Sequence, residues 1–259
     1  MNRPCSSQSG NVIFYVLLAV VLFAALSMVF MQSARQGSDT ISEEQTEIFV
    51  SEILEYSATI TTAVKALRLR GCREREISFE SAPFDGSDPD YTNSFAPSDF
   101  TCHVFHPSGG GVGRPSPAQG LFDQTHSGEE YFSEYFFTGF TCLNFVGDTS
   151  SSCGTGGGAD AELMMFLPYI REPICAELNR RLQLDNDGDI TADTGNAWEP
   201  AGRNATFSGV YGTGLPADTE VLAESTAPFN LEGALSGCFE GGNVPASGTY
   251  HYFQVMLPR

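Results

Sequence analysis

The sequence is poor in positive charge. Its 259 residues include 13 Lys and Arg against 32 Asp and Glu, which makes the formal net charge −19, and Lys65 is the only lysine. A surface of this kind repels phosphate backbones and anionic lipid, so the composition excludes a nucleic-acid partner. It can attract cations or basic partners, although an acidic exterior exposed to solvent is the simpler explanation.

Acidic residues are absent from the first 38 positions, and Asp39 is the first of them. Within this part, residues 11–31 form a run that is apolar from Val12 on, interrupted only by Tyr15, Ser27 and small residues. About 20 helical residues, each rising 1.5 Å, span the roughly 30 Å of bilayer hydrocarbon. The run therefore predicts a single transmembrane helix. The alternative is a core helix buried inside a domain.

The orientation of this segment follows from its flanks. Residues 1–10 carry Arg3 and no acid, which favours a cytoplasmic amino terminus, although Arg35 lies beyond the other end. The run is longer than the apolar region of about 7–15 residues in a secretory signal, so we expect it to remain in the mature protein. Residues 72–259 are then expected outside the cytoplasm.

The cysteine distribution agrees with this topology. Only Cys5 precedes the apolar run, and six follow it: Cys72, Cys102, Cys142, Cys153, Cys175 and Cys238. An even set is typical of disulfides formed in an oxidising compartment, and the absence of any CxxC pair argues against a zinc cluster. Fifteen connectivities are open in principle. Neighbouring predicted strands favour Cys72–Cys102, and Cys142–Cys153 would close a Gly/Ser loop, which leaves Cys175–Cys238.

The amino-terminal residues QSG, followed at once by a long apolar segment and then by an amphipathic one, resemble the leader and stem of type IV pilin-like proteins and type II secretion pseudopilins. The resemblance covers residues 6–70. It implies cleavage after Gly10, with Asn11 as the new amino terminus. Major pilins carry Phe and Glu at the first and fifth mature positions, where this chain has Asn11 and Tyr15. The resemblance therefore implies a minor subunit that works beside other pilin-like subunits.

The segment 32–71 is predicted to be an amphipathic stem helix. Thr40 and Glu43 fit a capping box at its start, and Gly71 fits the C-cap. Apolar side chains recur at helical spacing at Ile41, Ile48, Phe49, Ile53, Tyr56, Ile60, Val64 and Leu67. This stripe requires a partner, which is either a sheet of the same chain or a neighbouring subunit.

The fold class expected for the whole chain is α+β. A long amino-terminal helix, with a membrane half and an amphipathic half, would pack on a mainly antiparallel sheet with long loops. A short helix is predicted at 171–184, and Thr138-Gly139 is predicted as the turn of a hairpin between two aromatic runs. Further strands are predicted at 76–80, 100–105, 162–167, 205–211, 221–222 and 250–257.

The segment LDNDGDITADTG offers a candidate calcium loop. Its alternating carboxylates are Asp185, Asp187, Asp189 and Asp193, and hard cations prefer several oxygen ligands from one loop. The spacing departs from an EF-hand, so a polar turn after a helix is the alternative. Cys102, His103 and His106 invite a zinc site, but strand alternation would direct the two histidines to opposite faces, which favours structural roles.

These observations predict a structural subunit of a pilin-like or pseudopilin-like assembly. It would be a single-pass protein of the bacterial inner membrane with a periplasmic or extracellular domain. The alternative is a signal-anchored periplasmic binding domain, calcium-dependent or carbohydrate-recognising, that enters no filament. The sequence contains no GxSxG, HExxH or Walker motif, so an enzyme is not expected. No cofactor other than calcium is suggested.

Overall fold

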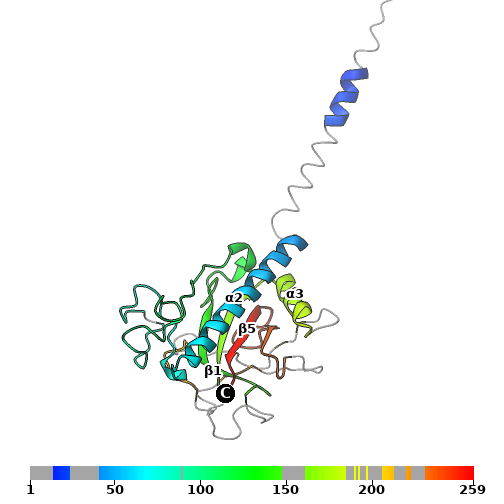
Figure 1. The fold of residues 1–259 in the computed structure, drawn as a ribbon. Helices are drawn as coiled ribbons and strands as arrows, with labels where there is room; N and C mark the ends of the chain where they lie inside the picture. Colours follow the sequence, from blue (N-terminus) through cyan, green and yellow to red (C-terminus); the bar gives the residue numbers. More distant parts are fainter. Residues whose placement is uncertain are drawn as a thin grey trace, which may run out of the picture. The chain divides into compact units, whose positions relative to one another are not determined.

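The chain divides into two units, Met1–Ser42 and Glu43–Arg259 (Figure 1). In the first unit, residues 14–23 form an exposed helix. The computed structural model describes residues 14–23, 41–88, 90–147, 161–184, 190, 192, 197, 206–212, 220–222 and 231–259.

The prediction of one long amino-terminal helix packed on the sheet is wrong. The helix that packs there is α2 (Glu43–Leu69), which belongs to the second unit, whereas the helical residues 14–23 belong to the first. Among the residues described, no helix is both long and apolar enough to cross a membrane. The stripe that packs on the sheet lies within α2, whose buried positions run from Thr46 to Leu67. Glu43 and Glu44 favour a helix start at that point.

Helix α2 buries its stripe within its own domain. The buried positions recur at helical spacing and are Thr46, Val50, Ile53, Ser57, Ile60, Ala63, Val64 and Leu67. The prediction that the amphipathic helix packs on a sheet of the same chain is therefore confirmed. Ile48, which the sequence placed in the stripe, is 56% exposed.

The sheet has five strands in the order β3-β1-β2-β5-β4. Strands β1 (Phe136–Leu143), β2 (Glu162–Ile170), β5 (Tyr250–Leu257) and β4 (Ser236–Glu240) pair antiparallel, and β3 (Glu220–Leu222) is parallel to β1. The α+β class and the mainly antiparallel sheet thus agree with the sequence-based expectation.

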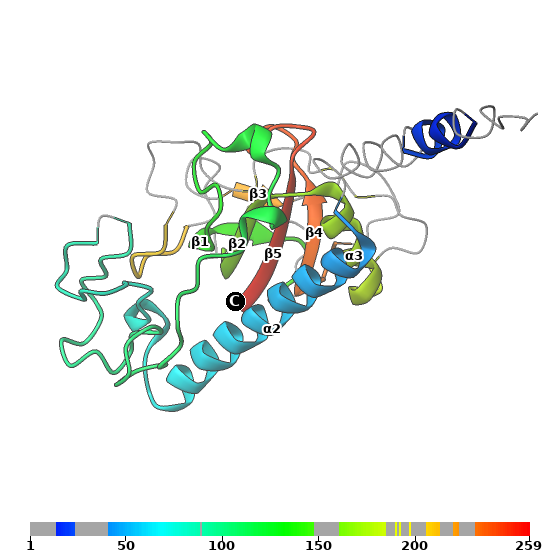
Figure 2. The same cartoon turned by 90° about the horizontal axis from the view of Figure 1, so that it is seen from above.

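Both faces of the sheet are covered, and all nine residues of β2 are buried. One face packs on α2 and on α3 (Glu172–Leu182), which lie on the same side of the sheet (Figure 2). The opposite face carries a second cluster that includes Phe136, Phe166 and Phe253. A strand covered on both sides reads as a continuous apolar run, as β2 does.

Several elements differ from their predictions because tertiary contacts override local patterns. Thr138 and Gly139 do not form a hairpin turn: β1 runs through them, with a register shift between Thr138 and Thr141. Strand β2 continues past Pro168 to Ile170, with a second register shift there.

The amino-terminal part of the domain also departs from the prediction. The strands expected at 76–80 and 100–105 are reduced to one isolated bridge between Ser78 and His103. The segment 206–212 forms no strand. Strand β4 was not predicted, since Phe239 is the one large buried side chain among its five residues.

Candidate functional site

The end of α2 concentrates arginines in a chain that has few basic residues. Four arginines lie at or just beyond the helix terminus: Arg68, Arg70, Arg73 and Arg75. Between them, Gly71 adopts a positive φ of 102°. The amides of Gly71 and Cys72 donate to the carbonyls of Arg68 and Leu67 and so close the last turn. The end of α2 and the group of four arginines therefore coincide.

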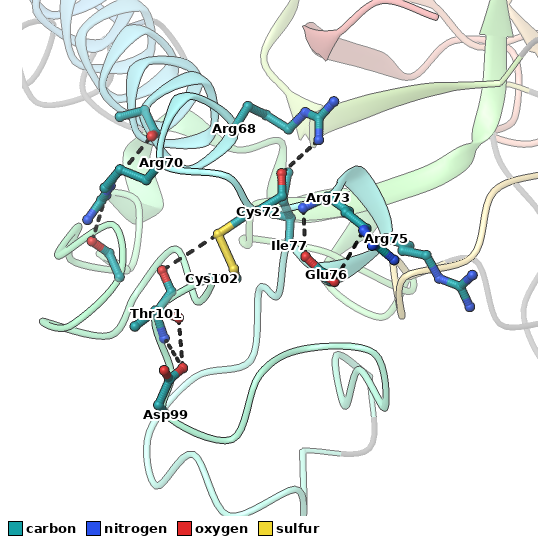
Figure 3. Close-up of a disulfide and its surroundings, with 12 residues drawn as sticks. Arg68, Arg70, Cys72, Arg73, Arg75, Glu76, Ile77, Asp99, Thr101 and Cys102 are labelled. Atoms are coloured by element: carbon teal, nitrogen blue, oxygen red, sulfur yellow. Dashed lines mark hydrogen bonds and ion pairs between the residues drawn. A yellow bond between two sulfur atoms is a disulfide. The ribbon is translucent and has the colours of Figure 1, made fainter.

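A disulfide holds the segment that follows the helix. Cys72 bonds Cys102 with a Cα–Cα distance of 5.8 Å, and Arg68 donates to the carbonyl of Cys72 at 2.7 Å (Figure 3). Arg70 extends to the carbonyl of Gly109 at 2.9 Å. Its side chain is thus committed to the neighbouring loop, whereas Arg68, Arg73 and Arg75 contribute to a pocket.

This pocket, called the arginine pocket below, has a volume of about 620 Å³. Four segments distant in sequence form its wall, which consists of Arg68, Arg73, Glu74, Arg75, Phe95, Gly209, Val210, Tyr211 and Arg259. The volume lies within the range of about 300–1,000 Å³ typical of small-ligand sites.

The charge of the wall is strongly positive. Four arginines face a single acid, Glu74, whose two oxygens lie 3.1 Å from Nη2 of Arg68 and 3.3 Å from Nε of Arg259. The wall therefore retains a surplus of three positive charges in a chain whose net charge is −19. Guanidinium groups stay protonated at all physiological pH values, so this surplus is permanent.

Aromatic rings orient two of these guanidinium groups. The guanidinium carbon of Arg75 lies 3.7 Å from the ring centre of Phe95, and that of Arg259 lies 4.0 Å from the ring centre of Tyr211. Such cation–π contacts fix the plane of the guanidinium group while leaving its N–H edge able to donate. Burial, followed by the charge of Glu74, raises the pKa of the Tyr211 phenol well above its usual value, so the phenol stays neutral.

The backbone beneath the pocket is anchored by Asn93. Its amide nitrogen donates to the carbonyls of Arg75 and Ile77 at 2.8 and 2.7 Å. Gly209, at φ 83°, lies against Asn93 and the carbonyl of Arg75, and no side chain would fit between them. The backbone of the wall is therefore held in place by contacts within the chain. Its chemistry suits recognition of an oxyanion by charge-assisted hydrogen bonds.

The predicted disulfides are partly visible in the described residues. Cys72–Cys102 and Cys175–Cys238 form as expected, the second with a Cα–Cα distance of 5.4 Å. Cys142 is also disulfide-bonded, and its expected partner Cys153 lies outside the described residues.

The other predicted sites lie largely outside the described part of the chain. These are the leader cleavage position, Gly10 and Asn11, and the calcium candidates Asp185, Asp187, Asp189 and Asp193. Where the structure does describe residues, it brings no three His, Cys, Asp or Glu side chains together as a metal site.

The histidines of the zinc hypothesis have structural surroundings. His103 is 3% exposed, and its Nε2 lies 3.4 Å from Glu80. The ring of His106 stacks on Phe100, and its Nδ1 accepts from the amide of Ser108. These contacts agree with the structural roles that the sequence favoured.

The sequence analysis missed the arginine pocket. The available signal was the spacing of Arg68, Arg73 and Arg75 in an otherwise acidic chain. It was insufficient because Phe95, Tyr211 and Arg259 join these arginines only in the folded domain.

Comparison of the chain with protein-family models, with curated proteins and with solved structures gave no match.

Proposed function

We propose that this chain is a minor subunit of a pilin-like or pseudopilin-like assembly, anchored in a bacterial inner membrane by residues 11–31. The main support for the proposal is that the unit following this apolar run contains disulfide bonds. Cys72–Cys102 and Cys175–Cys238 both lie within Glu43–Arg259. Disulfides persist in oxidising compartments, which supports a domain outside the cytoplasm.

The packing of α2 is consistent with this role. Its apolar stripe is already buried within its own domain, so association between subunits would depend on residues 11–31 and on exposed surfaces. Ala19, Ala24, Ala25 and Ser27 are small, and small residues allow membrane helices to approach closely.

The first experiment determines the amino terminus of the chain extracted from host membranes. A filament subunit begins at Asn11 after leader cleavage, and a plain signal anchor begins at Met1. A photo-crosslinker at Ala24 should then capture a different pilin-like protein. Capture of only copies of this chain, or of nothing, contradicts the assembly role.

A matched pair of variants tests the packing of the segment. Ala24→Leu keeps the run apolar but adds bulk, so membrane localisation should persist while cross-linking falls. Leu22→Ile changes shape without adding bulk and should leave both unchanged.

The second candidate is a membrane-anchored binding domain that enters no filament. The arginine pocket favours it, because a preformed, positively charged cavity in an acidic domain is suited to recognition. An uncleaved amino terminus together with ligand binding at the pocket would select this candidate.

A further inference from the structure

We infer that the arginine pocket is a docking site for an acidic peptide segment of a partner protein, carrying at least two carboxylates beside an apolar side chain. The inference rests on the proposed function in one respect: a subunit or tethered domain outside the cytoplasm acts by contacting other proteins.

The charge of the wall selects carboxylates. Glu74 is already shared between Arg68 and Arg259. Among the described residues, Arg75 has no carboxylate at ion-pair distance, and its guanidinium group is held only by the ring of Phe95. Arg73 is 81% exposed and reaches Glu76 only at 3.9 Å. Two guanidinium groups thus remain open to bidentate hydrogen bonds from incoming carboxylates.

The apolar part of the wall selects an additional side chain. Phe95 is 39% exposed and Val210 is 45% exposed, and both line the pocket beside the arginines. Arginine, tyrosine and other aromatic residues are the types that dominate binding energy at protein interfaces, whereas lysine is depleted there. A wall of arginines and aromatic rings therefore resembles the centre of a protein interface.

The size and the overall charge favour a short segment. An open pocket of about 620 Å³ accommodates a few side chains. A long polyanion, or a second copy of this acidic chain, would meet the repulsion of a net charge of −19 along the rest of the surface. A short acidic segment contacts only the pocket and therefore avoids most of this repulsion.

The wall is also preorganised. The Cys72–Cys102 disulfide and the two bonds from Asn93 hold the backbone between Cys72 and Ile77 before any partner arrives. Preorganisation lowers the entropic cost of binding, so a small site can achieve useful affinity.

The test measures binding of a fluorescein-labelled peptide, Glu-Glu-Phe-Glu-Glu, to the full chain in nonionic detergent by fluorescence polarisation. The comparison peptide is Gln-Gln-Phe-Gln-Gln. We expect the acidic peptide to bind at least about tenfold more tightly than its amide counterpart, because hydrogen bonds to charged groups contribute more free energy than hydrogen bonds between neutral groups. Raising NaCl from about 50 to about 300 mM should weaken binding, because salt screens exposed charge.

Single-charge variants locate the site. The substitutions Arg75→Gln and Arg73→Gln should each lower the affinity for the acidic peptide by about fivefold or more. Both side chains are exposed, so the fold is preserved, and an unchanged thermal midpoint verifies this. Arg180→Gln is the matched control, because Arg180 is exposed on α3, pairs with Glu177 and does not line the pocket. It should change the affinity less than about twofold.

Absence of peptide binding overturns the inference, and three more specific outcomes do so as well. They are equal binding of the two peptides, binding that neither pocket variant weakens, and no peptide binding together with self-association that Arg75→Gln abolishes. This last outcome would assign the pocket to contacts between copies of this chain. The assay needs neither leader cleavage nor other subunits. Peptide binding without cross-linking at Ala24 thus rejects the assembly role alone, and the reverse result rejects the docking site alone.

Discussion

Asn179 of α3 satisfies the free edge of β4 by making two hydrogen bonds of 2.8 Å to the backbone of one residue, Cys238. Its Nδ2 donates to the Cys238 carbonyl, and its Oδ1 accepts from the Cys238 amide. Strand β4 is the last in the sheet, so these backbone groups have no further strand to pair with. The disulfide from Cys175 ties the same two elements together. The helix therefore satisfies the edge of β4 at Cys238, while an isolated bridge pairs Glu240 of the same strand with Ala192.

Asn179→Ala should destabilise the domain by about 2–4 kcal/mol, because it leaves a buried N–H and a buried C=O unpaired at a cost of about 1–3 kcal/mol each. The midpoint of urea unfolding measures this. Arg180→Gln, exposed on the same helix, should change the unfolding free energy by less than about 0.5 kcal/mol. Equal effects of the two substitutions would contradict this account of the edge.

Removing the disulfide between α3 and β4 should also destabilise the domain. Cys175 and Cys238 are separated by 63 residues and Cys72 and Cys102 by 30. In the chain-entropy model the longer loop contributes about 4 kcal/mol, roughly 0.7 kcal/mol more than the shorter one. Paired Cys→Ala variants at each bridge, compared by urea unfolding, test this order. A larger loss at the shorter loop would indicate that entropy does not dominate.

Gly209 should tolerate no side chain. Its φ of 83° is strained for other residues, and an added Cβ would collide with Asn93 and the carbonyl of Arg75. Gly111 also has a positive φ, of 65°, but open space around it, so Gly111→Ala isolates the conformational cost of about 1–2 kcal/mol. Gly209→Ala should lower the thermal midpoint clearly more than Gly111→Ala. Equal midpoints would mean that the backbone under the pocket shifts to accommodate the added Cβ.

Two buried histidines should make stability depend on pH. Burial lowers the pKa of His103, against the opposing effect of Glu80, and lowers the pKa of His251 well below its usual value, with a smaller contribution from His126. Below about pH 6.5 the unfolded chain takes up protons that the folded chain does not, so the free energy of unfolding falls as pH decreases. NMR titration of the imidazole carbons measures both pKa values. Ordinary values at both sites would contradict the prediction.

Calcium binding at Asp185, Asp187, Asp189 and Asp193 stays a prediction from the sequence. If calcium binds only the folded chain, a concentration 100 times its dissociation constant adds about 2.7 kcal/mol to stability. The thermal midpoint should then rise with millimolar calcium, and Asp187→Ala should abolish the rise. An unchanged midpoint of the natural chain would refute the site.

Elements whose patterns are local could be predicted well. Helix α3 was predicted from the apolar spacing of Ile174 and Leu178, and the predicted strand at 250–257 coincides with β5. Thr138-Gly139 misled the prediction because Gly139 serves a contact and not a turn: an added Cβ would lie 2.8 Å from the ring of Phe207. Phe207 is far away in sequence, so no local pattern could reveal this.

The sequence by itself determined the acidic net charge, the apolar run at 11–31 and the supply of six cysteines beyond it, since all three follow from composition and order alone. It also determined four of the positions that α2 buries, Ile53, Ile60, Val64 and Leu67, because helical periodicity is local. Only the tertiary structure decided that Ile48 of the predicted stripe stays exposed, and that Arg75 and Arg259 line one pocket. The reason is physical: a helix buries the side chains that the folded domain covers, and a pocket exists only where the folded backbone brings distant side chains within contact.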